Sequence, residues 1–336
     1  MEIKAVLNGM GSVHKNLLRI LEDKKEVLSA KYGLTFKIIA VTDSSGVAIN
    51  QNGFDKLKLC TDKENGIRVS EFKGYAEGNL TDALKDIEYD IMFEASPVDH
   101  KTGGSALALV KSALSRGVSV VLANKGPVVV AHGELQSLAK ENNAHIKYSA
   151  TVCGGLPVLN IAEHDMVAGE FPLIRGVFNG TSNFICDGLL KGMSYEDALK
   201  EAQDVGAAEA DPSLDVDGWD TAFKLLIIVN SILGANITLD DIDVTGITDI
   251  TADMLQVEAA RGNTIKLVAS AENGKYSVKP IVLSKTDFLG SCDGWEMAVE
   301  IHSDIYGISY HKLYEKEPIP TAASMMRDAV NIFSQI

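Results

Sequence analysis

The chain has 336 residues, of which 46% are hydrophobic and 23% charged, so it can bury a sizeable core and is too apolar for a disordered protein. At roughly 100–200 residues per domain, this length predicts two domains. The 31 Lys and Arg against 46 Asp and Glu give a net charge of −15, which disfavours binding to nucleic acid or to an anionic membrane. We therefore expect a small diffusible ligand.

The N-terminus and the cysteines predict a soluble, cytoplasmic protein. The first apolar run ends at Gly9 with no basic segment before it, so it is not a signal peptide. No apolar run reaches the roughly 20 residues that cross a bilayer. The four cysteines include no Cys-x-x-Cys pair, which disfavours a disulfide framework or a structural zinc site.

The first 150 residues alternate short apolar runs with amphipathic stretches. Strands are predicted at residues 3–7, 36–41, 91–94, 118–122 and 145–148, with helices between them. The runs are apolar throughout, as in strands that are covered on both faces. We predict an α/β fold: a Rossmann-type, doubly wound parallel sheet over residues 1–148. The polar stretch 22–33 is interpreted as an extension of the first helix.

After Pro157 the pattern changes. Helices are predicted at 194–204 and 219–233, and shorter strands at 265–270 and 276–282. Ser194 with Asp197 resembles a capping box at the start of the first of these helices. We predict a second, α+β domain over residues 149–306. The remaining segment, 307–336, ends in an amphipathic helix at 318–333.

A glycine turn lies between the first predicted strand and the first helix, where a dinucleotide-binding fingerprint belongs. Its first glycine makes the turn, its second lets the backbone approach a pyrophosphate, and the helix N-terminus supplies amide donors. The third position is His14 instead of Gly or Ala. A plain turn is the alternative. We assign cofactor contacts to Gly9, Met10, Gly11, Ser12 and Val13.

The end of the second predicted strand bears on the choice of cofactor. Asp43 favours NAD, because an acid at this position binds ribose hydroxyls. Ser44 and Ser45 are able to bind a 2′-phosphate instead, with Lys56 or Lys58 supplying charge. The sequence therefore leaves NAD and NADP both open.

Two segments follow later predicted strands, and ligands of an open α/β sheet bind outside the carboxyl ends of its strands. Ser96 and Pro97 follow one strand, and Asn124 and Lys125 follow the next. We expect all four to face the cofactor. A solvated surface lysine is the alternative for Lys125, but its place between an apolar strand and Gly-Pro favours a functional role.

An acidic cluster precedes a lysine in the second half of the chain. An EF-hand calcium loop is excluded, because Lys224 would stand where a glutamate is required. Asp220 and Lys224, four residues apart, share one helix face. By themselves they favour an exposed ion pair, which is worth at most roughly 0.5 kcal/mol. The alternative is that the carboxylate of Asp220 holds the ammonium of Lys224 in place as a general acid. The cluster consists of Glu209, Asp211, Asp215, Asp217 and Asp220.

Taken in order, these segments resemble the signature of homoserine dehydrogenase. The matching residues are 9–14, 123–125, 180–183 (Gly-Thr-Ser-Asn), 201–212, 215–220 and Lys224. The resemblance implies a reversible, NAD- or NADP-dependent interconversion of L-aspartate 4-semialdehyde and L-homoserine, in the branch that leads to threonine, methionine and isoleucine. It also implies a homodimer built by the sheet of the second domain, and a C-terminal segment that returns to the nucleotide domain.

The same resemblance implies the roles of individual residues. Lys224, Lys125 and Asp220 form the expected catalytic group, because an ammonium near the reacting carbon stabilises an alkoxide and supplies its proton. The acidic side chains suit a substrate that carries an α-ammonium group. The expected substrate contacts are Gly180, Thr181, Glu209, Asp215, Asp220 and Lys224.

Two departures from the family pattern concern a monovalent cation and the cofactor lid. Family members often hold Na⁺ or K⁺ through a glutamate and backbone carbonyls, here those of Val152, Gly154 and Leu156. The position of the glutamate is Ser149, which weakens the expectation of a cation. Residues 314–319 replace a glycine-rich run.

Two rival functions remain. Aspartate-semialdehyde dehydrogenase would need a cysteine nucleophile, for which Cys153 is the candidate, but no activating base accompanies it. A nicotinamide-sensing repressor would need a basic helix-turn-helix, which this acidic chain lacks.

Overall fold

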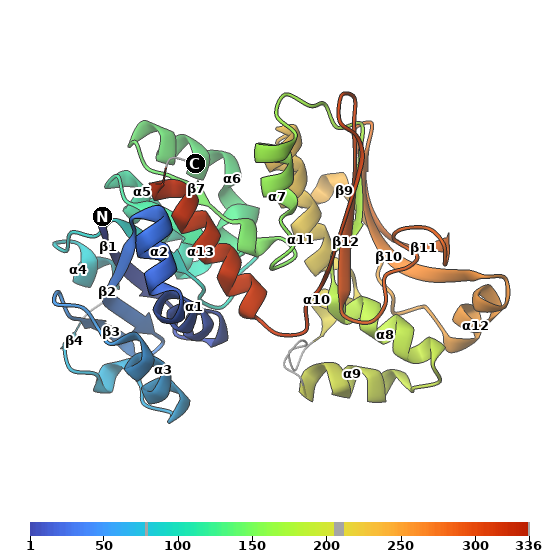
Figure 1. The fold of residues 1–336 in the computed structure, drawn as a ribbon. Helices are drawn as coiled ribbons and strands as arrows, with labels where there is room; N and C mark the ends of the chain where they lie inside the picture. Colours follow the sequence, from blue (N-terminus) through green and yellow to red (C-terminus); the bar gives the residue numbers. More distant parts are fainter. Residues whose placement is uncertain (78–79, 205–211, 335–336) are drawn as a thin grey trace. The chain divides into compact units, whose positions relative to one another are not determined.

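The computed structural model describes residues 1–77, 80–204 and 212–334 (Figure 1). The chain divides into two compact units. The first unit comprises residues 1–154 and 318–336, and the second comprises residues 155–317. Within the described residues, no helix is both long enough and apolar enough to cross a membrane.

The first unit is built on a seven-stranded sheet with the order β4-β3-β2-β1-β5-β6-β7. The predicted α/β class is confirmed, and all five predicted strands are present. They are the parallel strands β1 (Glu2–Asn8), β2 (Thr35–Asp43), β5 (Ile91–Glu94), β6 (Ser119–Leu122) and β7 (Ile146–Lys147).

The sequence predicted a parallel sheet, but the observed sheet also contains two antiparallel strands. β3 (Gly46–Ile49) runs antiparallel to β2, and β4 (Tyr75–Ala76) antiparallel to β3. The reason is a tight turn after Asp43, which ends at Gly46 with a φ of +143° and reverses the chain at once. A reversal of two residues leaves no room for a crossover helix, so the returning strand must be antiparallel.

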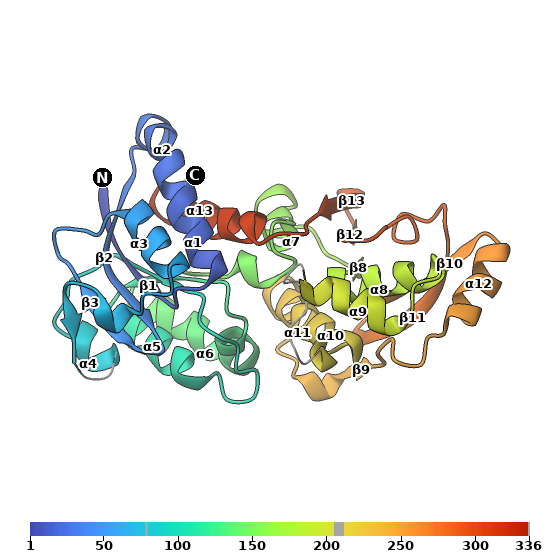
Figure 2. The same ribbon diagram turned by 90° about the horizontal axis from the view of Figure 1, so that it is seen from below.

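Helices cover both faces of this sheet, as in a doubly wound fold. Figure 2 shows α1 (Ser12–Asp23), α3 (Lys56–Glu64) and α13 (Ile319–Phe333) on one face, and α5 (Gly104–Ser115) and α6 (Gly126–Glu141) on the other. The predicted extension of the first helix through residue 33 is wrong. Lys24, at φ −101° and ψ 9°, leaves the helical region, and α2 (Lys25–Tyr32) is a separate helix that ends at the left-handed Gly33.

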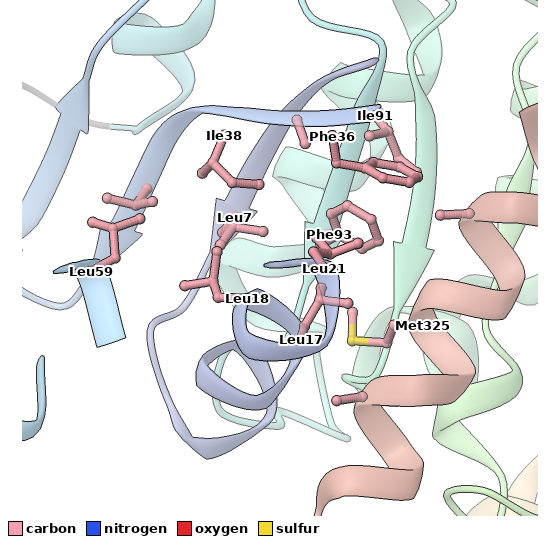
Figure 3. Close-up of a cluster of buried hydrophobic side chains, with 14 of the residues drawn as sticks. Leu7, Leu17, Leu18, Leu21, Phe36, Ile38, Leu59, Ile91, Phe93 and Met325 are labelled. Carbon is pink, nitrogen blue, oxygen red and sulfur yellow. The ribbon is translucent and has the colours of Figure 1, made fainter. Parts of the chain in front are cut away.

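The core of the first unit lies between β1, β2 and β5 and the helices α1 and α13 (Figure 3). Leu17, Leu18 and Leu21 form one apolar face of α1, which follows from their helical spacing. Met325 of α13 joins the same cluster, so the C-terminal helix completes this core. The strand side chains labelled in the cluster are Leu7, Phe36, Ile38, Ile91 and Phe93.

The second unit is built on a six-stranded sheet with the order β13-β12-β8-β10-β11-β9. Its two predicted strands are present as the hairpin of β10 (Asn263–Glu272) and β11 (Lys275–Ser284). Four further strands were not predicted, and each of them carries charged residues that interrupt an apolar run. They are β8 (Leu173–Val177), β9 (Ile242–Val244), β12 (Glu296–Ser303) and β13 (Gly307–Tyr314).

The helices of the second unit include both predicted ones. Residues 194–204 form α9 (Tyr195–Asp204), and Ser194 Oγ accepts a hydrogen bond from the backbone N–H of Asp197 at 3.0 Å, as the capping box predicts. Residues 219–233 form α11 (Trp219–Ile228) and a π-helical turn. The others are α7 (Val158–Asn160), α8 (Gly180–Leu190), α10 (Ser213–Val216) and α12 (Ala252–Ala260).

Candidate active site

The glycine turn closes against the end of β5. Gly9 has a φ of +91°, and a Cβ there would lie 2.8 Å from the carbonyl oxygen of Ala95, so only glycine fits. Its N–H donates to the backbone oxygen of Thr42 at 3.1 Å. Gly11 caps the N-terminus of α1 and has no heavy atom within 4 Å of its Cβ position. The turn therefore leaves an open helix N-terminus, which suits a phosphate group.

His14, at the third fingerprint position, is completely buried in α1. Its Nδ1 hydrogen-bonds the carbonyl oxygen of Gly9, so the neutral ring donates back to the turn. Burial lowers the pKa of His14 to about 4, although the bond to Gly9 opposes this shift. His14 is therefore neutral near pH 7 and braces the glycine turn.

A buried carboxylate that the sequence analysis missed organises the carboxyl ends of β1, β5 and β6. Glu94 is 0% exposed and accepts hydrogen bonds from the side chains of Asn8 and Ser96, and from the backbone N–H of Ser96 at 2.8 Å. Asn124 Nδ2 lies 3.3 Å from the same carboxylate. Because Glu94 ends an apolar strand, its charge at a buried position was the available signal.

The acid predicted to bind the ribose is held by protein donors. Asp43 Oδ1 accepts from the N–H and the hydroxyl of Ser45, and Oδ2 accepts from Lys63 Nζ at 2.7 Å and from Val69 N at 3.2 Å. Burial alone would raise the pKa of Asp43, but the bonds from Lys63 and Ser45 outweigh it and lower that pKa. Lys63, which the sequence analysis did not consider, neutralises this carboxylate.

The other residues predicted to bind a 2′-phosphate near β2 do not lie together around Asp43. Ser44 is exposed beside the turn. Lys56 lies 3.3 Å from Glu22, and Lys58 lies 2.8 Å from Asp62, so both ammonium groups have carboxylate partners.

At the end of β6, Asn124 and Lys125 start α6. Asn124 is 1% exposed, and its Oδ1 accepts from the N–H of Gly126 at 2.9 Å. Its Nδ2 lies 3.3 Å from Ser96 Oγ and 3.4 Å from the carbonyl oxygen of Pro97. The structure thus brings the two predicted segments together, with Lys125 half-buried at the helix N-cap.

In the second unit, Asn179 joins the start of α8 to the acidic cluster. Its Oδ1 caps the helix by accepting from the N–H of Ser182 at 2.7 Å. Its Nδ2 donates to Asp215 at 2.6 Å and to Asp220 at 2.8 Å. Asn179 was not predicted from the sequence, although it directly precedes the Gly-Thr-Ser-Asn segment at 180–183. Gly180 and Thr181, the next residues, form the first turn of α8.

Asp220 and Lys224 are a largely buried pair, not the exposed one that their spacing alone favoured. Lys224 Nζ lies 2.7 Å from Asp220 Oδ2, and their side chains are 13% and 10% exposed. Lys224 also donates to the carbonyl oxygen of Phe178 at 2.7 Å. Asp220 therefore sits between a lysine and the capping Asn179. Glu209 and Asp211 lie outside the described residues.

Two of the three carbonyl oxygens predicted to hold a cation accept hydrogen bonds from the protein. The carbonyl oxygen of Gly154 accepts from Ser324 Oγ, and that of Leu156 accepts from Val158 N, each at 2.8 Å. Within the described ranges, no group of three His, Cys, Asp or Glu side chains is placed to hold a metal ion. The residues present, with Ser149 in place of the glutamate, do not fit a cation site. Cys153, the nucleophile of a rival function, is 1% exposed.

These groups define two chemical functions. The first unit presents an open helix N-terminus and a network of polar side chains at the carboxyl edge of its sheet, as nucleotide sites of this fold do. The second unit holds the ammonium group of Lys224 beside the buried carboxylate of Asp220, and such a group can transfer a proton.

The chain is similar to known proteins of one family. Residues 157–330 match the family model described as homoserine dehydrogenase. The chain is 33% identical over 98% of its length to a homoserine dehydrogenase of Methanocaldococcus jannaschii, of which it covers 98%. It is 32% identical over 91% of its length to an NAD(+)-dependent homoserine dehydrogenase of Pseudomonas canavaninivorans, of which it covers 89%.

A similar solved structure is a hyperthermophilic archaeal homoserine dehydrogenase in complex with NADPH. It has a TM-score of 0.84 and 28% sequence identity, and the match covers 100% of this chain and 99% of that one. Together, the family model and the full-length relatives identify the family. This chain belongs to the homoserine dehydrogenase family.

Proposed function

We propose that Lys224 transfers the proton in the reaction of this family, the reversible NAD(P)-dependent reduction of L-aspartate 4-semialdehyde to L-homoserine. The observation that carries this proposal is the cluster of Asn179, Asp215, Asp220 and Lys224, in which Asn179 and Asp220 are buried. A bound nicotinamide supplies the hydride for reduction and takes it up in oxidation. Lys224 gives its proton to the alkoxide that forms, and in the reverse direction the neutral amine accepts a proton from the hydroxyl.

The residues around Lys224 set its charge and its direction. Asp220 favours the ammonium form, because an opposite charge at 2.7 Å stabilises it. The carbonyl oxygen of Phe178 fixes the ammonium from a second side. Reduction is therefore favoured at neutral pH. Oxidation of homoserine needs the neutral amine, so its rate rises as the pH becomes alkaline.

We propose the following further substrate contacts. Asp215 and Glu209 attract the α-ammonium group of the substrate. Gly180 and Thr181, in the first turn of α8, contact another part of the substrate. Thr181 is 5% exposed and Gly180 is half-buried, so this turn offers mainly backbone. Lys125 is a further proposed catalytic residue, as the family pattern implies.

The cofactor binds at residues 9–13, with Ser96, Pro97 and Asn124 on the neighbouring strand ends. All four acceptor positions of Asp43 are filled by protein donors, so it has no lone pair to offer a ribose hydroxyl. We therefore assign Asp43 to holding the turn at Ser44 and Ser45. A paired carboxylate does not repel a 2′-phosphate, and the enzyme accepts NADP as well as NAD.

The proposal includes a homodimer in the cytoplasm, formed through the sheet of the second unit. Ile308, Tyr310 and Tyr314 of β13 point to one face at alternate positions and are 52%, 51% and 61% exposed. Large apolar side chains on an edge strand favour association with a second chain.

Steady-state oxidation of L-homoserine with NAD and with NADP tests the assignment of Lys224. Lys224→Ala is expected to lower kcat by about 100-fold or more while cofactor affinity stays unchanged, as expected for a lost general acid–base. The matched control is Lys279→Ala, which removes an exposed lysine paired with Asp243 in the same unit. Wild-type protein that binds a cofactor but leaves homoserine unchanged would overturn the proposed reaction. A fully active Lys224→Ala variant would overturn the role of Lys224 alone.

A further inference from the structure

Two side chains of α13 hold the loop that leads out of the first unit. Ser149 donates to Asp328 twice, from its backbone N–H at 2.9 Å and from its hydroxyl at 2.8 Å. Ser324 Oγ donates to the carbonyl oxygen of Gly154 at 2.8 Å. The two α13 residues are four positions apart, so they project from one face of the helix and grip both ends of residues 149–154.

These contacts are shielded from water. Asp328 is 0% exposed, Ser324 2% and Ser149 5%. Burial raises the pKa of Asp328, and the bonds from Ser149 oppose that shift. A buried carboxylate that accepts two hydrogen bonds from one residue fixes that residue firmly, because losing them would leave its oxygens unsatisfied.

A third contact lies just beyond the boundary, in the second unit. The N–H of Gly155 donates to Glu315 Oε2 at 2.7 Å. Glu315 belongs to residues 314–319, the segment that departs from the glycine-rich family pattern. Both departures noted in the sequence, at Ser149 and at 314–319, therefore take part in the hydrogen bonds that hold one loop. We call Glu315, Ser324 and Asp328 the C-terminal clamp.

The clamp uses the groups that a cation would need. A hard cation requires several oxygen ligands, usually including a carboxylate. Asp328 and Glu315, the carboxylates that reach residues 149–155, both accept hydrogen bonds from the loop itself. Two of the three candidate carbonyl oxygens, those of Gly154 and Leu156, also accept hydrogen bonds.

Building on the proposed oxidation of homoserine, we propose that the C-terminal clamp orders this loop in place of a monovalent cation. Glu315, Ser324 and Asp328 are then positioning residues for the reaction. Catalysis by this chain is independent of Na⁺ and K⁺.

Binding of the cation can be measured without any reaction. Thermal unfolding of the wild-type protein is compared in NaCl, KCl and tetramethylammonium chloride at equal ionic strength. We expect equal midpoints, because an ion that binds the folded state would raise the midpoint as its concentration increases. A saturable rise with Na⁺ or K⁺ alone would overturn the proposal, whatever the substrate of the enzyme.

The same salts are then compared in homoserine oxidation. We expect rates that agree within about twofold, whereas a required ion would change them by about tenfold or more, the factor that 1.4 kcal/mol represents. Saturable activation by Na⁺ or K⁺ overturns the inference. If no homoserine is oxidised in any salt, the proposed function is wrong. The unfolding data still decide whether the ion binds.

Variants separate positioning from simple stability. Asp328→Ala is expected to lower kcat/KM for homoserine by about tenfold, as loss of hydrogen bonds to a charged group predicts, while the Kd of NADPH stays the same. Asp328→Asn is the matched control, because its amide accepts from the N–H of Ser149 and donates to its hydroxyl, and it should restore the rate. Asp328→Ala with a lowered Tm but unchanged kcat and KM would overturn the positioning role.

Discussion

The environment of single residues carries the strongest functional information in this protein. Lys224 and Asp220 have a common pair spacing, yet their low exposure and the contact between Asn179 and Asp220 distinguish them from a surface ion pair and support the proposed role of Lys224 as a proton donor. At Asp43 the environment instead argues against the role that the sequence predicted. A residue at the position of a cofactor ligand is fully engaged by Ser45, Lys63 and Val69.

The assignment of Asp43 can be tested by comparing the two cofactors. Asp43→Ala is expected to raise the KM for NAD and for NADP by a similar factor, because the turn loses its anchor instead of one ribose contact. Steady-state kinetics with both cofactors measure this ratio. A KM that rises for NAD alone would show that Asp43 binds the ribose directly.

His14 makes the stability of the first unit depend on pH. Its pKa is about 4 when folded and 6.5 when exposed, so its stabilising contribution is complete above pH 6.5 and is lost as the pH falls towards 4. Between pH 7 and pH 5 the free energy of unfolding should fall by about 2 kcal/mol more in the wild type than in His14→Gln, which cannot be protonated. Urea unfolding at both pH values measures the difference, and equal losses in the two proteins would contradict the account.

At the scale of elements, α8 is anchored to the second sheet by a buried ion pair. Lys266 of β10 is 1% exposed, and its Nζ lies 2.7 Å from Asp187 Oδ1 and 2.9 Å from Asn183 Oδ1, both on α8. Asp187 also accepts a hydrogen bond from the N–H of Gly294, two residues before β12 begins. The first turn of α8 is the proposed substrate contact, so this pair fixes the helix that presents it.

Removing one partner of that pair is expected to destabilise the protein strongly. Lys266→Met leaves Asp187 buried without its countercharge and should cost about 3–5 kcal/mol of unfolding free energy. The double variant Lys266→Met/Asp187→Leu should recover most of the loss, because it leaves no unpaired buried charge. Denaturant unfolding of the three proteins checks this, and a double variant no more stable than Lys266→Met would refute the explanation.

At the scale of the whole molecule, the chain builds its first unit from both ends of its sequence. Residues 1–154 and α13 share one core, to which Met325 contributes (Figure 3). The second unit is inserted between them and carries the exposed apolar side chains of β13. The proposed nucleotide binding and the proposed association therefore belong to different parts of the chain.

The proposed dimer predicts the effect of a charge on β13. Tyr310→Glu should convert the dimer to a monomer, because a carboxylate inside an apolar interface is costly to desolvate. Light scattering coupled to size exclusion measures the mass. Val257→Glu on α12, where the valine is also 51% exposed, serves as the control. A wild-type monomer, or a Tyr310→Glu dimer, would argue against this surface.

Local sequence patterns determined much of the first unit. The apolar runs of β1, β2, β5, β6 and β7 and the turn at Gly9 are set by neighbouring residues, since strand burial and a positive φ leave their mark within a few positions. Ordered motifs also identified the family. The same reasoning located β10, β11 and the helices α9 and α11 that precede them.

The tertiary structure decided the rest. No local pattern shows that Lys63 reaches Asp43, that Glu94 is buried among three strand ends, or that Asp328 binds Ser149 179 positions away. Hydrogen bonds between distant segments depend on how elements pack, and packing is set by the whole core. The sequence by itself therefore determined the elements that carry clear apolar or amphipathic runs and the family to which the chain belongs, whereas the fold decided which charges are paired and buried.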